Sequence, residues 1–204
     1  MKATTATAKG AATREMIVER AYAIACRQGL EGLSIGELAS EVGMSKSGVF
    51  AHFGSREDLQ LSVLDWTAER FAGSVLRPAL AHPRGLARLR AIMAGWFGWV
   101  RDNPDGCLIL GAAFEYDSCP GALHDRITGW LAGWRQALAR AVEMAVDSGE
   151  LPSATDPALL SFELFTLVQG FHHARLYDPA NADTLAQRSL ARLLGDAAPP
   201  SSAP

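Results

Sequence analysis

The amino-acid sequence predicts an all-α protein, and three observations lead to that fold class. Apolar residues recur every three or four positions along most of the chain, which is the period of a helix with one buried face. No run of β-branched residues alternates with polar ones, as a half-buried strand requires. The 204 residues are 49% apolar and 20% charged, a composition typical of a globular protein with an ample core.

Serine and proline positions mark the ends of the predicted helices. Ser34 and Glu37 have the spacing of a capping box, in which each side chain accepts from the other's backbone N–H. Ser45 is placed to cap the next helix. Arg77-Pro78 interrupts a longer helix, because proline lacks the backbone donor. The expected helices are about 15–28, 35–42, 45–53, 55–76, 84–102, 107–116, 120–148, 157–176 and 183–194.

Composition and helix length divide the chain into four segments. Residues 1–12 and 195–204 have little apolar surface to bury, so we expect mobile tails there. The short helices of residues 13–58 predict a first domain that is a three-helix bundle with a helix-turn-helix. The longer helices of residues 59–194 predict a larger second domain.

The charge balance and the cysteines exclude several classes of protein. Nineteen Lys and Arg against 22 Asp and Glu give a net charge of −3, so any surface for nucleic acid must be local. Cys26, Cys107 and Cys119 form no Cys-x-x-Cys pair, which argues against a disulfide framework or a zinc site. The longest uncharged runs fall short of the ~20 residues of a membrane span, and the N-terminus lacks a signal peptide's apolar stretch. We expect a cytoplasmic protein with no metal, no cofactor and no membrane partner.

The helix after the tight turn at 42–44 has the features of a DNA-recognition helix. In a helix-turn-helix, the second helix enters the major groove and its first turn faces the base edges. The first turn here is Ser45-Lys46-Ser47-Gly48, whose hydroxyls and ammonium can bind phosphate and whose glycine permits close approach. Residues 1–56 carry a net charge of +2 and residues 57–204 a net charge of −5, which is consistent with a DNA-binding end.

Residues 13–59, above all LSIGELASEVGMSKSGVFAHFGSREDL, resemble the DNA-binding domain of the tetracycline-repressor (TetR) family of transcriptional regulators. The resemblance implies that operator DNA is contacted from the helix-turn-helix, with bases or phosphates near Lys46 and phosphates at His52 and Arg56. Phe50 stands where the family usually has a tyrosine, which removes one phosphate donor. The DNA-binding residues expected are Ser34, Ser45, Lys46, Ser47, Gly48, Val49, Phe50, His52 and Arg56.

The resemblance also implies a homodimer and a small-molecule effector. One short recognition helix reads few base pairs, so specificity requires two heads at half-sites about one helical turn, ~34 Å, apart. The helix at 157–176 is apolar around most of its circumference and needs cover on two sides. The expected interface residues are Leu160, Leu164, Val168, Phe171, Leu190 and Leu194. Aromatic walls favour a flat apolar ligand, and the expected pocket residues are Met93, Trp96, Phe114, Trp130, Trp134 and His172.

Other interpretations of individual motifs stay open. Residues 32–36 match the Gly-x-Ser-x-Gly of hydrolases, so a helical hydrolase using Ser34 is an alternative, although helical flanks favour a capping role. A DNA-independent helical adaptor is a third class. Cys119 precedes a helix start, where a lowered thiol pKa would make it a redox sensor. The cations Lys2, Lys9 and Arg14 either track phosphate or only solubilise the N-terminus.

Overall fold

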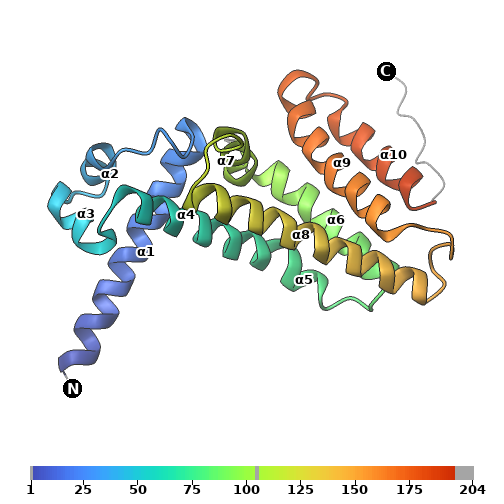
Figure 1. Ribbon diagram of the computed structural model, residues 1–204, viewed down its shortest axis with the longest axis horizontal. Helices are drawn as coiled ribbons and strands as arrows, with labels where there is room; N and C mark the ends of the chain where they lie inside the picture. The colour runs from blue at the N-terminus through green and yellow to red at the C-terminus, as the bar shows by residue number, and fades with distance from the viewer. Residues whose placement is uncertain (1, 104–105, 196–204) are drawn as a thin grey trace. The chain divides into compact units, whose positions relative to one another are not determined.

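A computed structural model describes residues 2–103 and 106–195, with side chains from residue 8 onward, and it is all-α over these ranges (Figure 1). The described residues form two compact units. Unit 1 contains residues 2–70 and 106–130, and unit 2 contains residues 71–103 and 131–195. The domain boundary expected between residues 58 and 59 therefore falls inside unit 1. Residues 196–204 of the expected C-terminal tail, and the side chain of Lys2, lie outside the described residues.

Unit 1 begins with the helix-turn-helix bundle, whose helices are α1 (Lys2–Gln28), α2 (Ile35–Glu41), α3 (Lys46–Phe53) and α4 (Arg56–Phe71). Its core is apolar, because one face of every helix and the turn between α1 and α2 supply fully buried side chains. The largest of these are Ile17, Ile24, Leu30, Leu33, Leu38, Val49 and Leu59. The same faces are the apolar stripes that the sequence predicts.

The start of α1 differs from the sequence prediction. We expected a mobile tail over residues 1–12 and a helix from about Glu15, whereas α1 begins at Lys2. The alanine content of this stretch favours the earlier start, since alanine has the highest helix propensity. Thr13 adds a local bond, with its hydroxyl donating to the Lys9 carbonyl at 2.9 Å. The helix therefore starts earlier than expected, and the mobility of residues 1–12 stays a prediction.

Unit 1 also contains α7 (Leu108–Glu115) and the first part of α8 (Ala122–Asp147). Helix α7 packs against α1, and its apolar side chains Leu108, Ile109 and Leu110 are buried. Helix α8 begins at Ala122 rather than at Pro120, so the exposed Cys119 precedes the first turn. Residues distant in sequence thus share one core with the helix-turn-helix bundle.

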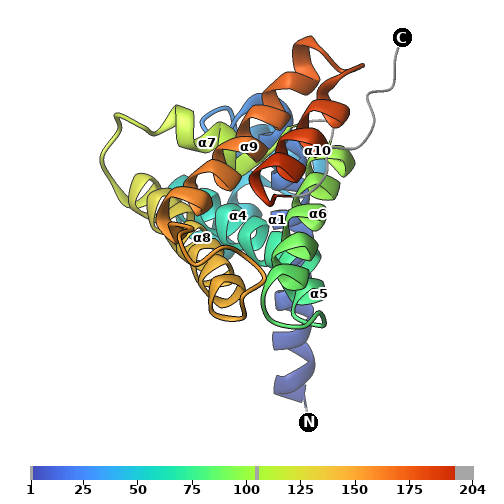
Figure 2. The same ribbon diagram turned by 90° about the vertical axis from the view of Figure 1, so that its right-hand side faces the viewer.

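Unit 2 contains η1 (Ala72–Leu76), α5 (Arg77–Ala79), α6 (Leu86–Asp102), the rest of α8, α9 (Pro157–Tyr177) and α10 (Ala182–Leu193). Helices α9 and α10 lie side by side (Figures 1 and 2). Pro78 does not end the helix as expected. The chain widens into a π-helix at η1 and continues to Ala79, because Pro78 sits in the first turn of α5, where no backbone donor is required.

None of the described helices combines the length and the apolar character that crossing a membrane requires.

Candidate nucleic-acid interface

Two serine caps and one glycine shape the helix-turn-helix. Ser34 Oγ accepts from the Glu37 backbone N–H at 3.1 Å, and Ser45 Oγ accepts from the Gly48 N–H at the same distance. Gly43 has a φ of +66°, a left-handed conformation that a side chain would strain, and this permits the tight turn between α2 and α3. The Glu37 carboxylate accepts from the Gln28 amide at 2.8 Å instead, so the Ser34 cap supplies one half of the predicted capping box.

The first turn of α3 presents small polar side chains and one cation. Ser45, Lys46 and Ser47 are exposed, and the two serine hydroxyls lie 3.0 Å apart. A Cβ atom at Gly48 would lie 3.3 Å from both Met44 Cε and Ser45 Oγ, so the lack of a side chain permits this close packing. Exposed N–H groups at a helix start, with a lysine and hydroxyls beside them, bind phosphate. Lys46 is therefore the best-placed cation for a DNA contact.

Val49 does not face solvent, and the expectation that it contacts DNA is wrong. Its side chain is 0% exposed and lies in the core of the bundle, on the same face of α3 as Phe53. Phe50 points outward and is 44% exposed, and His52 is half-buried beside Phe53. The exposed side of α3 thus contains Phe50 but excludes Val49.

Arg56 is engaged within the chain. Its Nε donates to the Leu33 carbonyl at 3.0 Å and its Nη1 to the Glu31 carboxylate at 3.2 Å. The remaining nitrogen, Nη2, donates to the Glu31 carbonyl. These bonds tie the start of α4 to the turn between α1 and α2, and the phosphate contact that the resemblance implies for Arg56 stays a prediction.

The other cations of the bundle differ in what they contact. Arg14 donates to the Ser62 hydroxyl at 2.6 Å and its guanidinium lies 4.8 Å from the centre of the Phe53 ring, so Arg14 packs α1 against α3 and α4. Arg20 and Arg27 are 3.6 and 3.8 Å from the carboxylate of Glu41. Lys9 is exposed on α1.

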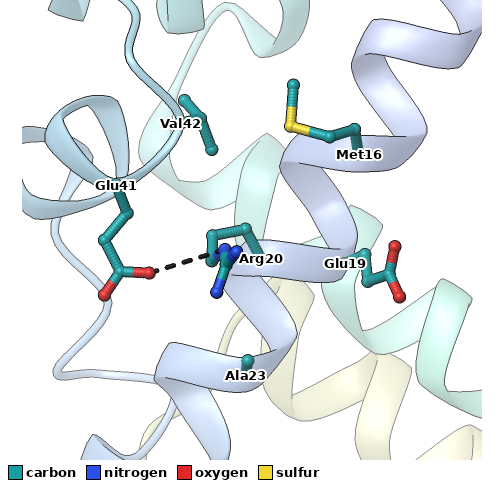
Figure 3. A pocket seen from close by; sticks show the side chains of 6 residues that line it. All are labelled: Met16, Glu19, Arg20, Ala23, Glu41 and Val42. Carbon is teal, nitrogen blue, oxygen red and sulfur yellow. Dashed lines mark ion pairs between the residues drawn. The ribbon is translucent and has the colours of Figure 1, made fainter.

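Unit 1 also has an open cleft between α1 and the end of α2, with a volume of about 450 Å³ (Figure 3). An ion pair between Arg20 and Glu41 crosses it, and Glu19 adds a second carboxylate. These charges make it a poor phosphate groove. The sequence analysis missed the cleft, although its α1 residues have the spacing of one helix face. The lining residues are Met16, Glu19, Arg20, Ala23, Glu41 and Val42.

The six expected pocket residues are divided between the two units. Met93, Trp96 and Trp134 are buried in unit 2, whereas Trp130 and the 66% exposed Phe114 belong to unit 1. His172 is half-buried in unit 2; burial, and to a lesser extent the neighbouring His173, lowers the pKa of His172. Phe114 is too exposed to line an enclosed site.

An aromatic cluster lies at the centre of unit 2. Trp96 and Trp134 contact each other edge to face, with ring centres 5.2 Å apart. Phe71 lies 4.9 Å from Trp134, and Phe165 lies 5.5 Å from Trp96, both also edge to face. The sequence analysis missed Phe71 and Phe165 as members of this cluster.

Most of the residues expected at a dimer interface lie in the core of the chain instead. The apolar side that we assigned to the partner is the side of α9 that enters this chain's own core. Leu160, Leu164, Val168, Phe171 and Leu194 are buried within the chain, and Leu190 is half-buried. The large apolar side chains exposed on α9 and α10 are Leu159, Phe162, Leu176, Tyr177 and Leu185.

Comparisons with known proteins give a consistent result. The sequence model of bacterial regulatory proteins of the tetR family matches residues 11–63, and that of the tetracyclin repressor-like C-terminal domain matches residues 85–190. The nucleoid occlusion factor SlmA of Cronobacter sakazakii is 26% identical over 167 residues, which cover 80% of this chain and 82% of that protein.

Two solved structures are also similar. A TetR transcriptional regulator from Chloroflexus aurantiacus matches with a TM-score of 0.77 and 26% identity over 92% of this chain and 94% of that chain. AibR, solved in complex with isovaleryl coenzyme A and operator DNA, matches with a TM-score of 0.73 and 21% identity over 90% of this chain and 99% of its own.

Proposed function

This chain belongs to the TetR family of transcriptional regulators, and from that premise we propose that it is a repressor that binds operator DNA as a homodimer and is released by a small molecule. The DNA contact is made by the first turn of α3, with Ser45, Lys46 and Ser47 at the phosphates or base edges. The exposed, serine-capped start of α3 is the observation that carries this proposal. AibR, a protein of the same fold, is solved on operator DNA.

The dimer is formed through the outer face of α9 and α10. Leu159 and Phe162 on α9, and Leu185 on α10, are large apolar side chains that stay exposed in the single chain. A groove of about 170 Å³ between α9 and α10 is lined by Leu185 and by small residues such as Gly170 and Ala174, which permit close approach of another helix. Exposed apolar surface of this kind marks interaction sites.

The effector binds in unit 2, at the aromatic cluster of Trp96, Trp134, Phe71 and Phe165. Edge-to-face rings with few polar groups suit an apolar or planar ligand. Because the rings contact each other directly, the ligand must separate them, which supplies a structural difference between the bound and free states. A ligand that prefers the DNA-incompetent state reduces operator affinity by about 5- to 150-fold at typical coupling energies.

The alternative of a hydrolase is disfavoured by the environment of Ser34. Its hydroxyl oxygen caps α2 by accepting from the Glu37 N–H, and Ser34 follows the turn between α1 and α2 rather than the strand that precedes a hydrolase nucleophile. We propose that the chain has no enzymatic activity and acts in the cytoplasm, where chromosomal DNA is accessible. Loss of an esterase activity in Ser34→Ala would instead support the hydrolase.

The experiment that tests the proposed function is selection of DNA from a random pool by the full-length protein. We expect the retained sequences to contain two related half-sites in inverted orientation, because a twofold dimer presents two copies of α3. Retention of no common sequence would refute operator binding and favour the adaptor. A single half-site without a symmetric partner would refute the dimer.

A further inference from the structure

The turn between α1 and α2 is held by a carboxylate from α7. The Leu30 backbone N–H donates to Glu115 Oε1 at 3.1 Å, and the Glu31 N–H donates to Glu115 Oε2 at 2.8 Å. Gly29, with a φ of +81°, starts this turn, and a side chain at that position would collide with the Glu115 carboxylate. One side chain thus satisfies two consecutive backbone donors, which fixes the path of the turn.

A second set of bonds surrounds the same turn. The Tyr116 hydroxyl donates to Glu31 Oε2 at 2.6 Å, and the buried Gln60 amide donates to the Leu30 carbonyl at 2.8 Å. The hydrogen bond from Tyr116 lowers the pKa of Glu31, while burial, and then the bond to Glu31, raises the pKa of Tyr116. The pair is therefore a charge-assisted hydrogen bond between a neutral phenol and a carboxylate at neutral pH.

These bonds join the two parts of the chain that the family models separate. The turn lies in the stretch that matches the DNA-binding model, residues 11–63, whereas Glu115 and Tyr116 lie in the stretch that matches the C-terminal domain, residues 85–190. Both sets of residues are in unit 1. The end of α7 is thus a place where the C-terminal stretch directly hydrogen-bonds the stretch that matches the DNA-binding model.

We propose that Glu115 and Tyr116 are positioning residues for operator binding, and that release of their hold on the α1–α2 turn is how a movement of α7 reaches α2 and α3. This proposal rests on the proposed function. The turn leads within two residues to the Ser34 cap of α2, so its path sets where α2 starts. Neither residue belongs to the first turn of α3, where we place the DNA contacts.

The dipole of α1 opposes the hydrogen bonds between Glu115 and the α1–α2 turn. Glu115 lies beside the C-terminal end of α1, where the helix dipole disfavours a negative charge. The two N–H bonds offset that repulsion. A shift of α7 that breaks both bonds leaves the carboxylate with only the unfavourable dipole interaction.

The first test needs no DNA. Amide hydrogen exchange is measured at Leu30 and Glu31 in the full-length protein, in Glu115→Gln, and in Asp117→Asn, which makes the same charge change at an exposed neighbouring site. We expect exchange at both amides to become about tenfold faster in Glu115→Gln, since local opening governs protection, and to stay unchanged in Asp117→Asn. Equal exchange in all three proteins would overturn the hold of Glu115 on the turn.

The second test uses the selected operator and a scrambled duplex. We expect Glu115→Gln to weaken operator binding about tenfold, within the coupling range known for linked sites, and to leave binding to the scrambled duplex unchanged. Tyr116→Phe should shift operator affinity in the same direction by less. Unchanged operator affinity in both variants, or an equal loss on both duplexes, would overturn the positioning role. If the wild-type protein selects no operator, the proposed function fails, and the exchange measurement still decides whether Glu115 holds the turn.

Discussion

Substitutions at two neighbouring positions on α9 allow dimerisation and folding to be tested separately. Phe162 is 52% exposed on the outer face of the helix, whereas Leu164, two residues later, is 0% exposed in the core of unit 2. If the outer face of α9 joins two copies of the chain, Phe162→Glu must weaken the dimer and leave the fold intact. Leu164→Ala must destabilise the fold and leave the dimer interface intact.

The size of the effect at Phe162 follows from its exposure. Full burial of a phenylalanine side chain contributes about 1.5–3 kcal/mol, so covering the exposed half in a dimer contributes roughly 1 kcal/mol. A symmetric interface contains the residue twice, and the dimer gains roughly 2 kcal/mol. At about 1.4 kcal/mol per tenfold change, the dissociation constant rises about 30-fold in Phe162→Ala. A glutamate raises it further, because a buried carboxylate without a partner is costly.

Sedimentation velocity over a concentration series measures this dissociation constant, and circular dichroism reports the fold. Leu164→Ala leaves a cavity and should lower the free energy of unfolding by about 2–5 kcal/mol, while the folded fraction still sediments as a dimer. The Phe162→Glu monomer should melt at the same temperature as the wild-type monomer. An unaltered dimer in Phe162→Glu would refute the interface, and a monomeric but fully stable Leu164→Ala would refute the assignment of the two faces.

Four further predictions concern the helix-turn-helix and the titratable groups. Lys46→Ala should reduce the salt dependence of operator binding, by about 0.9 in the log–log slope for each of two heads; an unchanged slope would remove Lys46 from the phosphate contacts. Ser45→Ala should destabilise unit 1 by about 1 kcal/mol through loss of the α3 cap, which a denaturant titration measures. Burial raises the folded pKa of Tyr22 and of Tyr116, so the unfolded phenols ionise first and the free energy of unfolding should fall as the pH rises above about 10; Tyr22→Phe should flatten that decline. His172 has a lowered folded pKa, so the protein should lose stability as the pH falls below about 6.5, and a wild-type acid profile in His172→Asn would contradict its burial.

Features set by local sequence could be predicted. The caps at Ser34 and Ser45 and the turn at Gly43 depend on residues within three or four positions, and each is found where the sequence places it. The burial of Val49 was also accessible, since Val49 and Phe53 are four positions apart on one face of α3. The resemblance to DNA-contacting positions led to a different assignment, and the helical period was the better guide.

Features that depend on distant residues could not be predicted. Helix α9 is apolar around most of its circumference, so its sequence cannot tell which side enters the core and which stays exposed. The structure resolves this by packing Phe171 on Phe97 of α6, with ring centres 5.1 Å apart. The role of Arg56 was likewise hidden, because its partners Glu31 and Leu33 lie in a turn more than twenty positions away.

The contacts of the α1–α2 turn show that the helix-turn-helix sequence alone does not determine the direction of α2. Arg56 and Gln60 of α4 bind the turn from one side and Glu115 binds it from another, so the direction of α2 depends on contacts with an element some 85 positions away in the sequence. In the proposed function, DNA contacts depend on the exposed, charged start of α3, whereas the direction of α2 depends on hydrogen bonds to the backbone of the α1–α2 turn. Variants outside residues 13–59 should therefore change operator affinity without any loss of phosphate contacts, which is a pattern that the recognition sequence alone does not predict.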